Sequence, residues 1–114
     1  MAEPNQVIVV WNVRGINNPA KRDAIKNLIL YSGASVVCLQ ETKVQDMNLG
    51  LVQQCLGPAF DNFFYVPAVG TRGGVLLACN SSNVQMSNSH VTQNTVTSWI
   101  AYGEHGWWFT GVYG

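Results

Sequence analysis

Two polar side chains that can bind a cation each follow a short apolar segment near the start of the chain. Asn12 follows residues 7–11, and Glu41 follows residues 36–39 and Gln40. We interpret both segments as strands, because continuous β-branched runs of this length are typical of a buried sheet. If one helix joins them, they are parallel and their carboxyl ends share one edge of a sheet. Asn12 and Glu41 should therefore meet, and a carboxylate beside a carboxamide favours a hard cation such as Mg²⁺.

The segment between these two strands has the pattern of an amphipathic helix. Asn18 can cap its first turn, and Pro19 suits the first helical position. Gly33 can end the helix after Ser32 in a left-handed conformation. The expected buried stripe comprises Ala24, Ile25, Leu28 and Ile29. The first 43 residues therefore predict a βαβ unit.

After this unit the sequence changes to mostly β-structure. Asp46 is expected to cap a shorter helix that runs to Leu56 and ends at Gly57 and Pro58. Apolar or alternating segments between turn residues predict strands at 63–66, 75–79, 84–92, 95–102 and 107–113. Residues 80–83 and 103–106 are expected to form turns, the second closing a hairpin. The fold class is therefore α/β (α+β), in one unit over residues 1–114 without repeats or linkers.

Composition limits the classes of protein to which the chain can belong. Its 114 residues, 47% hydrophobic and 11% charged, suit a small globular domain rather than a disordered segment. No apolar run is long enough to cross a membrane, and the first residues lack a signal-peptide pattern. We therefore expect an intracellular protein, cytoplasmic or nuclear, with no membrane partner.

Charge is distributed unevenly, although the formal net charge is zero. Five of the six basic residues lie within residues 1–43, together with three of the six acidic residues. The basic excess thus lies on the side of the proposed site. Lys21, Arg22 and Lys26 also suit the solvated face of a helix, so both interpretations remain open.

The cysteines and histidines indicate no second site. Cys38, Cys55 and Cys79 are odd in number, widely spaced and apolar in context, which indicates reduced core thiols rather than disulfides or a zinc site. His90 and His105 have no partner at ligand spacing, so we expect both on the surface.

Two groups of residues have both a structural and a functional interpretation. Trp99, Trp107 and Trp108 suit core or inter-sheet packing, and a platform for stacking bases is the alternative. The adjacent glycines after Arg72 suit backbone geometry at the start of a strand, and a substrate-facing loop is the alternative.

Four short motifs occur in an order that is typical of one enzyme family. They are WNVRG at residues 11–15, QETK at 40–43, GTRGGV at 70–75 and TGVYG at 110–114. Together they resemble the endonuclease/exonuclease/phosphatase superfamily. More narrowly, the chain is similar to the apurinic-endonuclease-like domain that long interspersed (non-LTR) retrotransposons of plants carry ahead of their reverse transcriptase. The resemblance covers essentially the whole chain.

The resemblance implies a fold, a reaction and a role for each matched residue. The family folds as two packed, mostly antiparallel sheets with helices outside, and hydrolyses phosphodiester bonds with Mg²⁺ or Mn²⁺. Glu41 then corresponds to the carboxylate metal ligand, and Asn12 to a residue that organises the metal and the phosphate. Tyr113 corresponds to a residue that hydrogen-bonds a phosphate oxygen or positions a catalytic group. The residues expected to contact the substrate are Arg14, Lys43 and Arg72.

Later motifs of the family are missing from the sequence, which determines the activity we expect. A Gly-Asp-Phe-Asn-like segment and a C-terminal Asp-His pair supply the general base and further metal ligands in the family, and neither occurs in this sequence. We therefore expect the N-terminal half of a DNA endonuclease domain, which holds its metal weakly and is inactive by itself. The alternative is a non-catalytic association or folding module derived from that domain.

The missing half also affects the partners that we expect. DNA is the expected partner of the parent domain. Half of a two-sheet sandwich should leave one apolar sheet face exposed between Phe63 and Phe109, which favours self-association, aggregation or binding of the missing C-terminal half.

Overall fold

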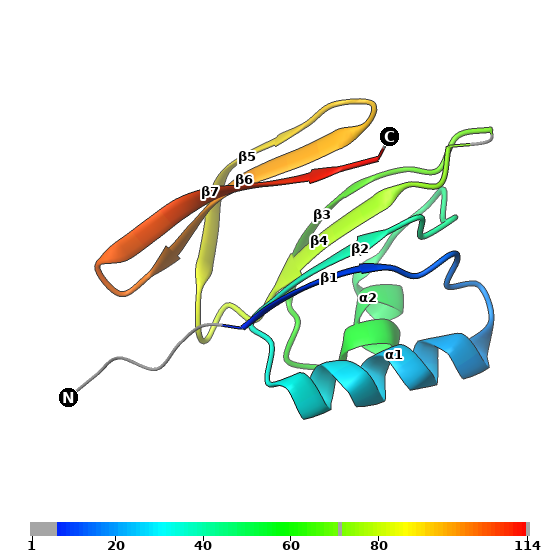
Figure 1. The fold of residues 1–114 in the computed structure, drawn as a ribbon, viewed down its shortest axis with the longest axis horizontal. Coiled ribbons are helices and arrows are strands. Elements are labelled where there is room, and N and C mark those ends of the chain that lie inside the picture. Colours follow the sequence, from blue (N-terminus) through cyan, green and yellow to red (C-terminus); the bar gives the residue numbers. More distant parts are fainter. Residues whose placement is uncertain (1–6, 71, 114) are drawn as a thin grey trace.

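A layer of helices and two β-sheets make up the computed structural model, which describes residues 7–70 and 72–113 (Figure 1). The elements are β1 (Ile8–Asn12), α1 (Pro19–Ser32), β2 (Val36–Gln40), α2 (Leu49–Leu56), β3 (Asn62–Val66), β4 (Val75–Cys79), β5 (Gln85–Val91), β6 (Thr95–Tyr102) and β7 (His105–Val112). This order confirms the predicted βαβ start and the later change to β-structure. Neither of these helices is long and apolar enough to cross a bilayer, as far as the described residues extend.

The first sheet contains the βαβ unit at one side. Its strand order is β1-β2-β4-β3, in which β1 and β2 are parallel and the other neighbours are antiparallel. Residues Val36–Gln40 of β2 are almost entirely buried, as predicted, but β1 is an edge strand and its Val10 is 54% exposed. The prediction of two fully buried strands is therefore wrong for β1, because an apolar run does not reveal how many neighbours a strand has.

Both helices are capped at their N-termini by asparagine. The Asn18 Oδ1 accepts a backbone N–H of the first turn of α1 at 2.8 Å, and Gly33 ends that helix with φ +70°, as predicted. The cap of α2 is Asn48 rather than the predicted Asp46. The difference arises because the Met47 side chain is buried in the core before the helix begins, so Asp46 lies too early in the chain to cap the helix.

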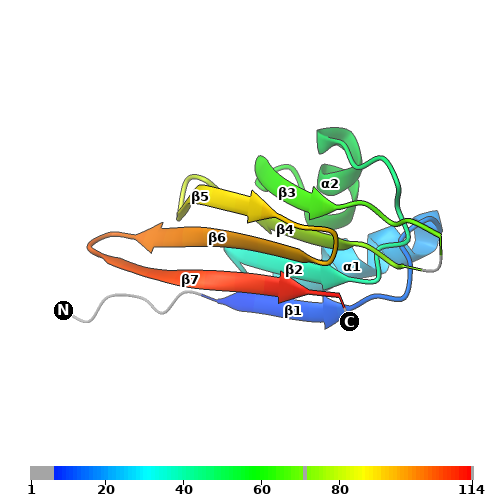
Figure 2. The same ribbon diagram turned by 90° about the horizontal axis from the view of Figure 1, so that it is seen from above.

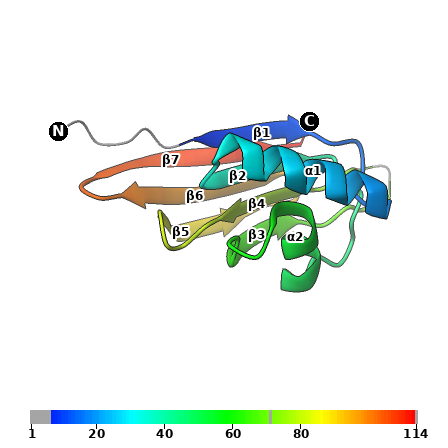
Figure 3. The same cartoon turned by 90° about the horizontal axis from the view of Figure 1, so that it is seen from below.

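The buried stripe of α1 is narrower than its sequence pattern suggests. Ile25 and Ile29 are buried, whereas Ala24 and Leu28 are exposed. The helix lies along β1 and β2 at the margin of the first sheet (Figure 3), so only one of its apolar ridges has sheet beneath it.

The second sheet is antiparallel, with the strand order β5-β6-β7. β6 has the predicted bounds, and the ends of β5 and β7 shift by one or two residues. Tyr102 pairs with His105, so the hairpin turn has two residues and is shorter than the predicted turn. Gly103 makes this possible with φ +56°, which suits the first position of such a turn. β5 contains a bulge, with Asn88 at φ +51°.

The inner faces of the two sheets pack on one another (Figure 2). Cys38, Leu77 and Ile100 belong to the apolar core between the sheets, and a second core lies between the first sheet and the helices. The two sheets approach each other closely at Gly111 of β7, where an added Cβ would lie 2.8 Å from the Cys38 Sγ. The predicted two-sheet α/β fold is confirmed. The predicted exposed inner face is wrong, because this chain supplies strands to both layers.

The outer face of the second sheet carries no described helix (Figure 1). Trp107 packs against the core between the sheets, as predicted. Trp108 is 59% exposed and makes an edge-to-face contact with Trp99, with ring centroids 5.3 Å apart. Core packing was therefore the wrong interpretation for this pair, because Trp107 and Trp108 are adjacent in a strand and must point to opposite faces.

All three cysteines are free and buried, which confirms the prediction of core thiols. Burial raises the pKa of Cys38, Cys55 and Cys79 to about 11. The thiols are therefore protonated near neutral pH. His90 and His105 are exposed, as predicted.

Candidate functional site

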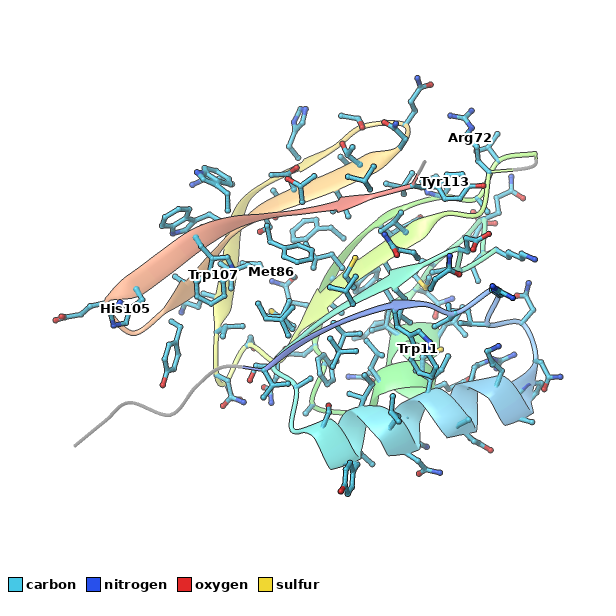
Figure 4. All side chains as sticks on the ribbon, in the orientation of Figure 1. Trp11, Arg72, Met86, His105, Trp107 and Tyr113 are labelled. Atoms are coloured by element: carbon cyan, nitrogen blue, oxygen red, sulfur yellow. The ribbon has the colours of Figure 1, made fainter. Side chains whose placement is uncertain are left out.

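Residues from three strand ends meet at one edge of the sandwich. Asn12 ends β1, Glu41 directly follows β2, and Tyr113 directly follows β7. These residues line a cavity of about 260 Å³ together with Gln40 and Val112. Asn12 pairs with Gln40 in the parallel ladder, so the ends of β1 and β2 lie side by side. The predicted meeting of Asn12 and Glu41 is confirmed, and the second sheet brings Tyr113 to the same edge (Figure 4).

The loops after β1 and β2 have an unusual backbone. Arg14, Glu41 and Lys43 have φ values of 53°, 57° and 58°, in the left-handed region that residues with a Cβ seldom adopt. Such strain persists where surrounding contacts enforce it. The Gly15 N–H donates to the Glu41 carbonyl at 2.6 Å, and the Glu41 N–H donates to the Gly74 carbonyl at 2.9 Å. Loops on both sides therefore hold Glu41 in place.

The two glycines that precede β4 allow their loop to lie against Glu41. A Cβ added at Gly73 would lie 3.0 Å from the Glu41 Cα. Gly74 has φ +80°, and an added Cβ there would lie 2.8 Å from the Thr42 Oγ1. These contacts confirm the structural interpretation of the glycine pair, which supports the site without lining its cavity.

A second cavity, of about 320 Å³, is formed by the loops that follow β1 and β2 together with the start of α1. Its lining residues are Arg14, Gly15, Asn17, Asn18, Lys21 and Lys43. Three of these side chains are basic and none is acidic, so an anion such as phosphate is favoured there. Arg14 and Lys43, both predicted to contact the substrate, are thus brought together.

Two other arginines line neither of these cavities. The Arg72 Nη1 donates to the Gln93 Oε1 at 3.4 Å, so the substrate contact predicted for Arg72 stays a prediction. The Arg22 Nε donates to the Ile16 carbonyl at 2.8 Å, and its Nη1 donates to the Gln54 Oε1 at 2.7 Å. Arg22 therefore joins α1 to α2 and to the loop before α1, rather than forming a solvated face.

Gln40 is a site residue that the sequence analysis missed. Its Nε2 donates to the Val112 carbonyl at 3.0 Å, from the first sheet to the second. The Tyr113 N–H donates to the Asn94 carbonyl at 2.8 Å. These two bonds hold the end of β7 at the cavity. A signal was present in the sequence, because Gln40 is a polar residue at the end of an otherwise apolar strand.

Comparison with known proteins identifies the family. Residues 9–108 match the endonuclease/exonuclease/phosphatase family. The chain belongs to this family. A search of curated protein sequences gives no match.

Solved structures share the fold of this family member. TDP2 of D. rerio in complex with a single-strand DNA product has a TM-score of 0.65 and 19% identity, over 90% of this chain and 43% of that one. A D. rerio TDP2 humanized by 14 mutations has a TM-score of 0.65 and 20% identity, over 90% and 47%. The AP endonuclease LMAP from Leishmania major has a TM-score of 0.60 and 17% identity, over 93% and 39%. The chain therefore spans less than half the length of these structures.

The endonuclease/exonuclease/phosphatase family generally uses a divalent metal, and the first cavity offers part of a site for one. Glu41 supplies a carboxylate, but no cluster of three or more His, Cys, Asp or Glu occurs within residues 7–70 and 72–113. The Asn12 Oδ1 accepts the Arg14 N–H at 3.2 Å, which orients the carboxamide and leaves a lone pair for a ligand. Two protein oxygens suit an ion that keeps most of its water, so these residues fit weakly bound Mg²⁺.

Proposed function

We propose that this chain forms the metal- and phosphate-binding half of a Mg²⁺- or Mn²⁺-dependent endonuclease that cleaves DNA. The observation that carries this proposal is the meeting of Asn12, Glu41 and Tyr113 in one cavity beside a second cavity lined by basic residues. A nucleic-acid backbone presents phosphates at regular spacing, so one phosphate suits the metal and the next suits the basic side chains. DNA as the substrate is supported by the D. rerio TDP2 structure, which contains a DNA product.

The motif set supports a more specific origin for the domain. WNVRG, QETK, GTRGGV and TGVYG occur in the order that resembles plant retrotransposon endonucleases. We infer that the parent protein joins this domain to a reverse transcriptase. Such a protein would act on DNA inside the cell, in the cytoplasm or the nucleus.

The site residues would bind and orient the substrate. Glu41 and Asn12 would hold the metal, and Tyr113 would donate its hydroxyl to a phosphate oxygen. Arg14 and Lys43 would bind a neighbouring phosphate and so position the scissile bond. When bound, the metal would polarise the phosphoryl oxygen and stabilise the leaving oxygen.

No general base is found among the described residues that line the two cavities. Apart from Glu41, these described residues include no carboxylate and no histidine. A general base typically contributes a factor of about 10²–10⁴ to the rate. Preorganised charge stabilisation contributes a further factor of about 10²–10³. We therefore expect this chain to bind a nucleic-acid backbone without cleaving it at a measurable rate.

Binding of a labelled single-stranded oligonucleotide, followed by fluorescence anisotropy, tests this proposal. We expect weak binding in Mg²⁺, and the double variant Arg14→Gln/Lys43→Gln should weaken it. The slope of log affinity against log salt should fall by about 0.7 for each phosphate that the variant no longer neutralises. Lys26→Gln is the matched control, because Lys26 is a basic residue that lines neither cavity. Equal weakening by Lys26→Gln would contradict a specific phosphate path.

A nicking assay on supercoiled plasmid, in Mg²⁺ and in Mn²⁺, tests the expected lack of cleavage with the same protein preparation as the binding experiment. The Glu41→Ala variant reveals contaminating nuclease. Nicking by the unmodified chain that disappears in Glu41→Ala would show that a base is supplied from elsewhere, for example by a second copy.

One observation favours a second function. In the part of the chain that the structure describes, β1 and β7 are edge strands of their sheets, and an unpaired strand edge suits an association or folding module. This function would not need a complete catalytic site.

A further inference from the structure

Arg22 of α1 donates hydrogen bonds to the loop before its own helix and to the neighbouring helix. Its Nε donates to the Ile16 carbonyl at 2.8 Å, and its Nη2 donates to the Asn17 carbonyl at 2.9 Å. Its Nη1 donates to the Gln54 Oε1 of α2, which lies beside α1 (Figure 3), at 2.7 Å. A guanidinium is a rigid planar fork, so it fixes two successive carbonyls at once. The end of the loop between β1 and α1 is therefore held in place.

The loop that Arg22 holds is bonded in turn to the loop after β2. The Ile16 N–H donates to the Thr42 carbonyl at 3.0 Å, and the Asn17 Nδ2 donates to the Lys43 carbonyl at 3.1 Å. Ile16 is fully buried, and both its N–H and its carbonyl are thus paired. The bonds that Arg22 makes therefore also limit how far Lys43 can move.

These two loops carry basic side chains of the second cavity. Arg14 and Lys43 line it, and their backbones are left-handed, with φ values of 53° and 58°. Such a backbone persists only where surrounding contacts enforce it. The Lys43 side chain also lies over Gly15, where an added Cβ would lie 3.3 Å from the Lys43 Cδ. Contacts between the loops therefore set the directions of both cations.

Arg22 itself is not placed to bind a phosphate in this cavity. It is absent from the lining residues, and each of its three side-chain nitrogens already donates a hydrogen bond within the chain. Lys21, the preceding residue of α1, does line the cavity. Successive residues of a helix point in different directions, so Lys21 faces the cavity while Arg22 faces the loop and α2.

We propose that Arg22 is a positioning residue for the phosphate cavity. It holds the loop between β1 and α1 so that Arg14 and Lys43 present their charges to one phosphate before the substrate arrives. Preorganisation of this kind reduces the entropy that is lost when side chains become ordered on binding, so a residue outside the cavity raises the affinity. This inference rests on the proposed function, because it requires a nucleic-acid phosphate to bind there.

Fluorescence anisotropy with the labelled single-stranded oligonucleotide in Mg²⁺ tests the proposal. Arg22→Lys keeps the charge but loses the fork, so we expect it to weaken binding about three- to tenfold. Gln54→Ala is the matched control, because it removes the bond to α2 and leaves both carbonyl bonds of Arg22. It should leave the affinity unchanged.

The salt dependence separates positioning from direct contact. Arg22→Gln removes the charge as well as the fork. The slope of log affinity against log salt should nevertheless equal that of the unmodified chain, because Arg22 neutralises no phosphate. A direct phosphate contact would lower this slope by about 0.7.

Asn17→Ala breaks the next bond toward Lys43 without changing the charge, and it tests the same path if the Arg22 variants fold poorly. It should weaken binding by a similar factor, and the double variant Arg22→Lys/Asn17→Ala should bind no more weakly than either single variant. In NMR spectra, both single variants should shift the amide signals of Gly15 and Lys43, and Gln54→Ala should leave them in place.

Several results would overturn the proposal. They are unchanged affinity in Arg22→Lys or Asn17→Ala, additive losses in the double variant, a lower salt slope in Arg22→Gln, and equal weakening by Gln54→Ala. Unchanged binding in Arg14→Gln/Lys43→Gln would reject the proposed function and this inference together. Weaker binding in that variant with no effect of Arg22→Lys would reject the inference alone.

Discussion

Glu41 differs from the other acidic residues in both its position and its backbone. It follows an almost entirely buried strand, it is held in a left-handed conformation, and it lines the same cavity as Asn12. The hydrogen bonds of Gly15 and Gly74 to its backbone limit how far the residue can move. A residue whose backbone is fixed in this way loses less conformational entropy when its carboxylate binds a cation.

The first prediction concerns the metal. Titration with Mg²⁺ should shift the NMR signals of Glu41 and Asn12 only at millimolar concentration, since a single carboxylate replaces little of the water around the ion. Glu41→Gln should remove these shifts, because it removes the charge and keeps the shape. Glu104→Gln, in the exposed hairpin turn, should leave them unchanged. Shifts that survive in Glu41→Gln would show that the metal binds elsewhere.

The elements place these residues through contacts between layers. β1 and β2 set the spacing of Asn12 and Glu41, whereas Tyr113 reaches the cavity only because β7 packs over β2. Gln40 joins these two strands with its bond to the Val112 carbonyl. We therefore regard Gln40 as a positioning residue for Tyr113.

The second prediction tests this role. Gln40→Ala should shift the amide and ring signals of Tyr113 and should cost about 0.5–1.5 kcal/mol of unfolding free energy, as expected for one hydrogen bond. Gln53→Ala is the matched control, because the Gln53 Nε2 also donates to a carbonyl, that of Pro58, at 3.1 Å. It should cost similar stability without moving the Tyr113 signals. Equal shifts from both variants would indicate general loosening instead.

In the whole molecule, the buried thiols couple stability to pH. Burial raises the pKa of Cys38, Cys55 and Cys79 from 9.0 to about 11 in the folded chain. Between these values the unfolded chain releases protons that the folded chain keeps. The stabilising contribution is therefore complete below pH 9 and is lost as the pH rises toward 11.

The third prediction is that the urea midpoint of unfolding falls as the pH rises from 9 to 11. Cys38→Ala should show a shallower fall, because one of the three groups is removed. Comparing slopes rather than absolute midpoints separates this effect from the ionisation of lysine and tyrosine. Identical slopes in the two proteins would exclude a contribution from the Cys38 thiol.

Local sequence patterns were sufficient for the elements and for half of the site. The caps Asn18 and Gly33, the bounds of β4 and β6, and the meeting of Asn12 and Glu41 all follow from interactions within a few residues or within one βαβ unit. These features are local, or they depend on the constant handedness of the crossover. They could therefore be read without knowing the neighbours of each strand.

Other features were decided by tertiary packing. The exposure of Val10 depends on β1 being an edge strand, and the direction of Trp108 depends on which face of β7 meets the first sheet. The role of Gln40 requires β7 to lie above β2. The amino-acid sequence thus determined which segments form strands and which polar residues end them. Only the tertiary arrangement of the two sheets decided which strands lie at a sheet edge and which side chains from distant segments share a cavity. Burial depends on neighbours in space that no local pattern specifies.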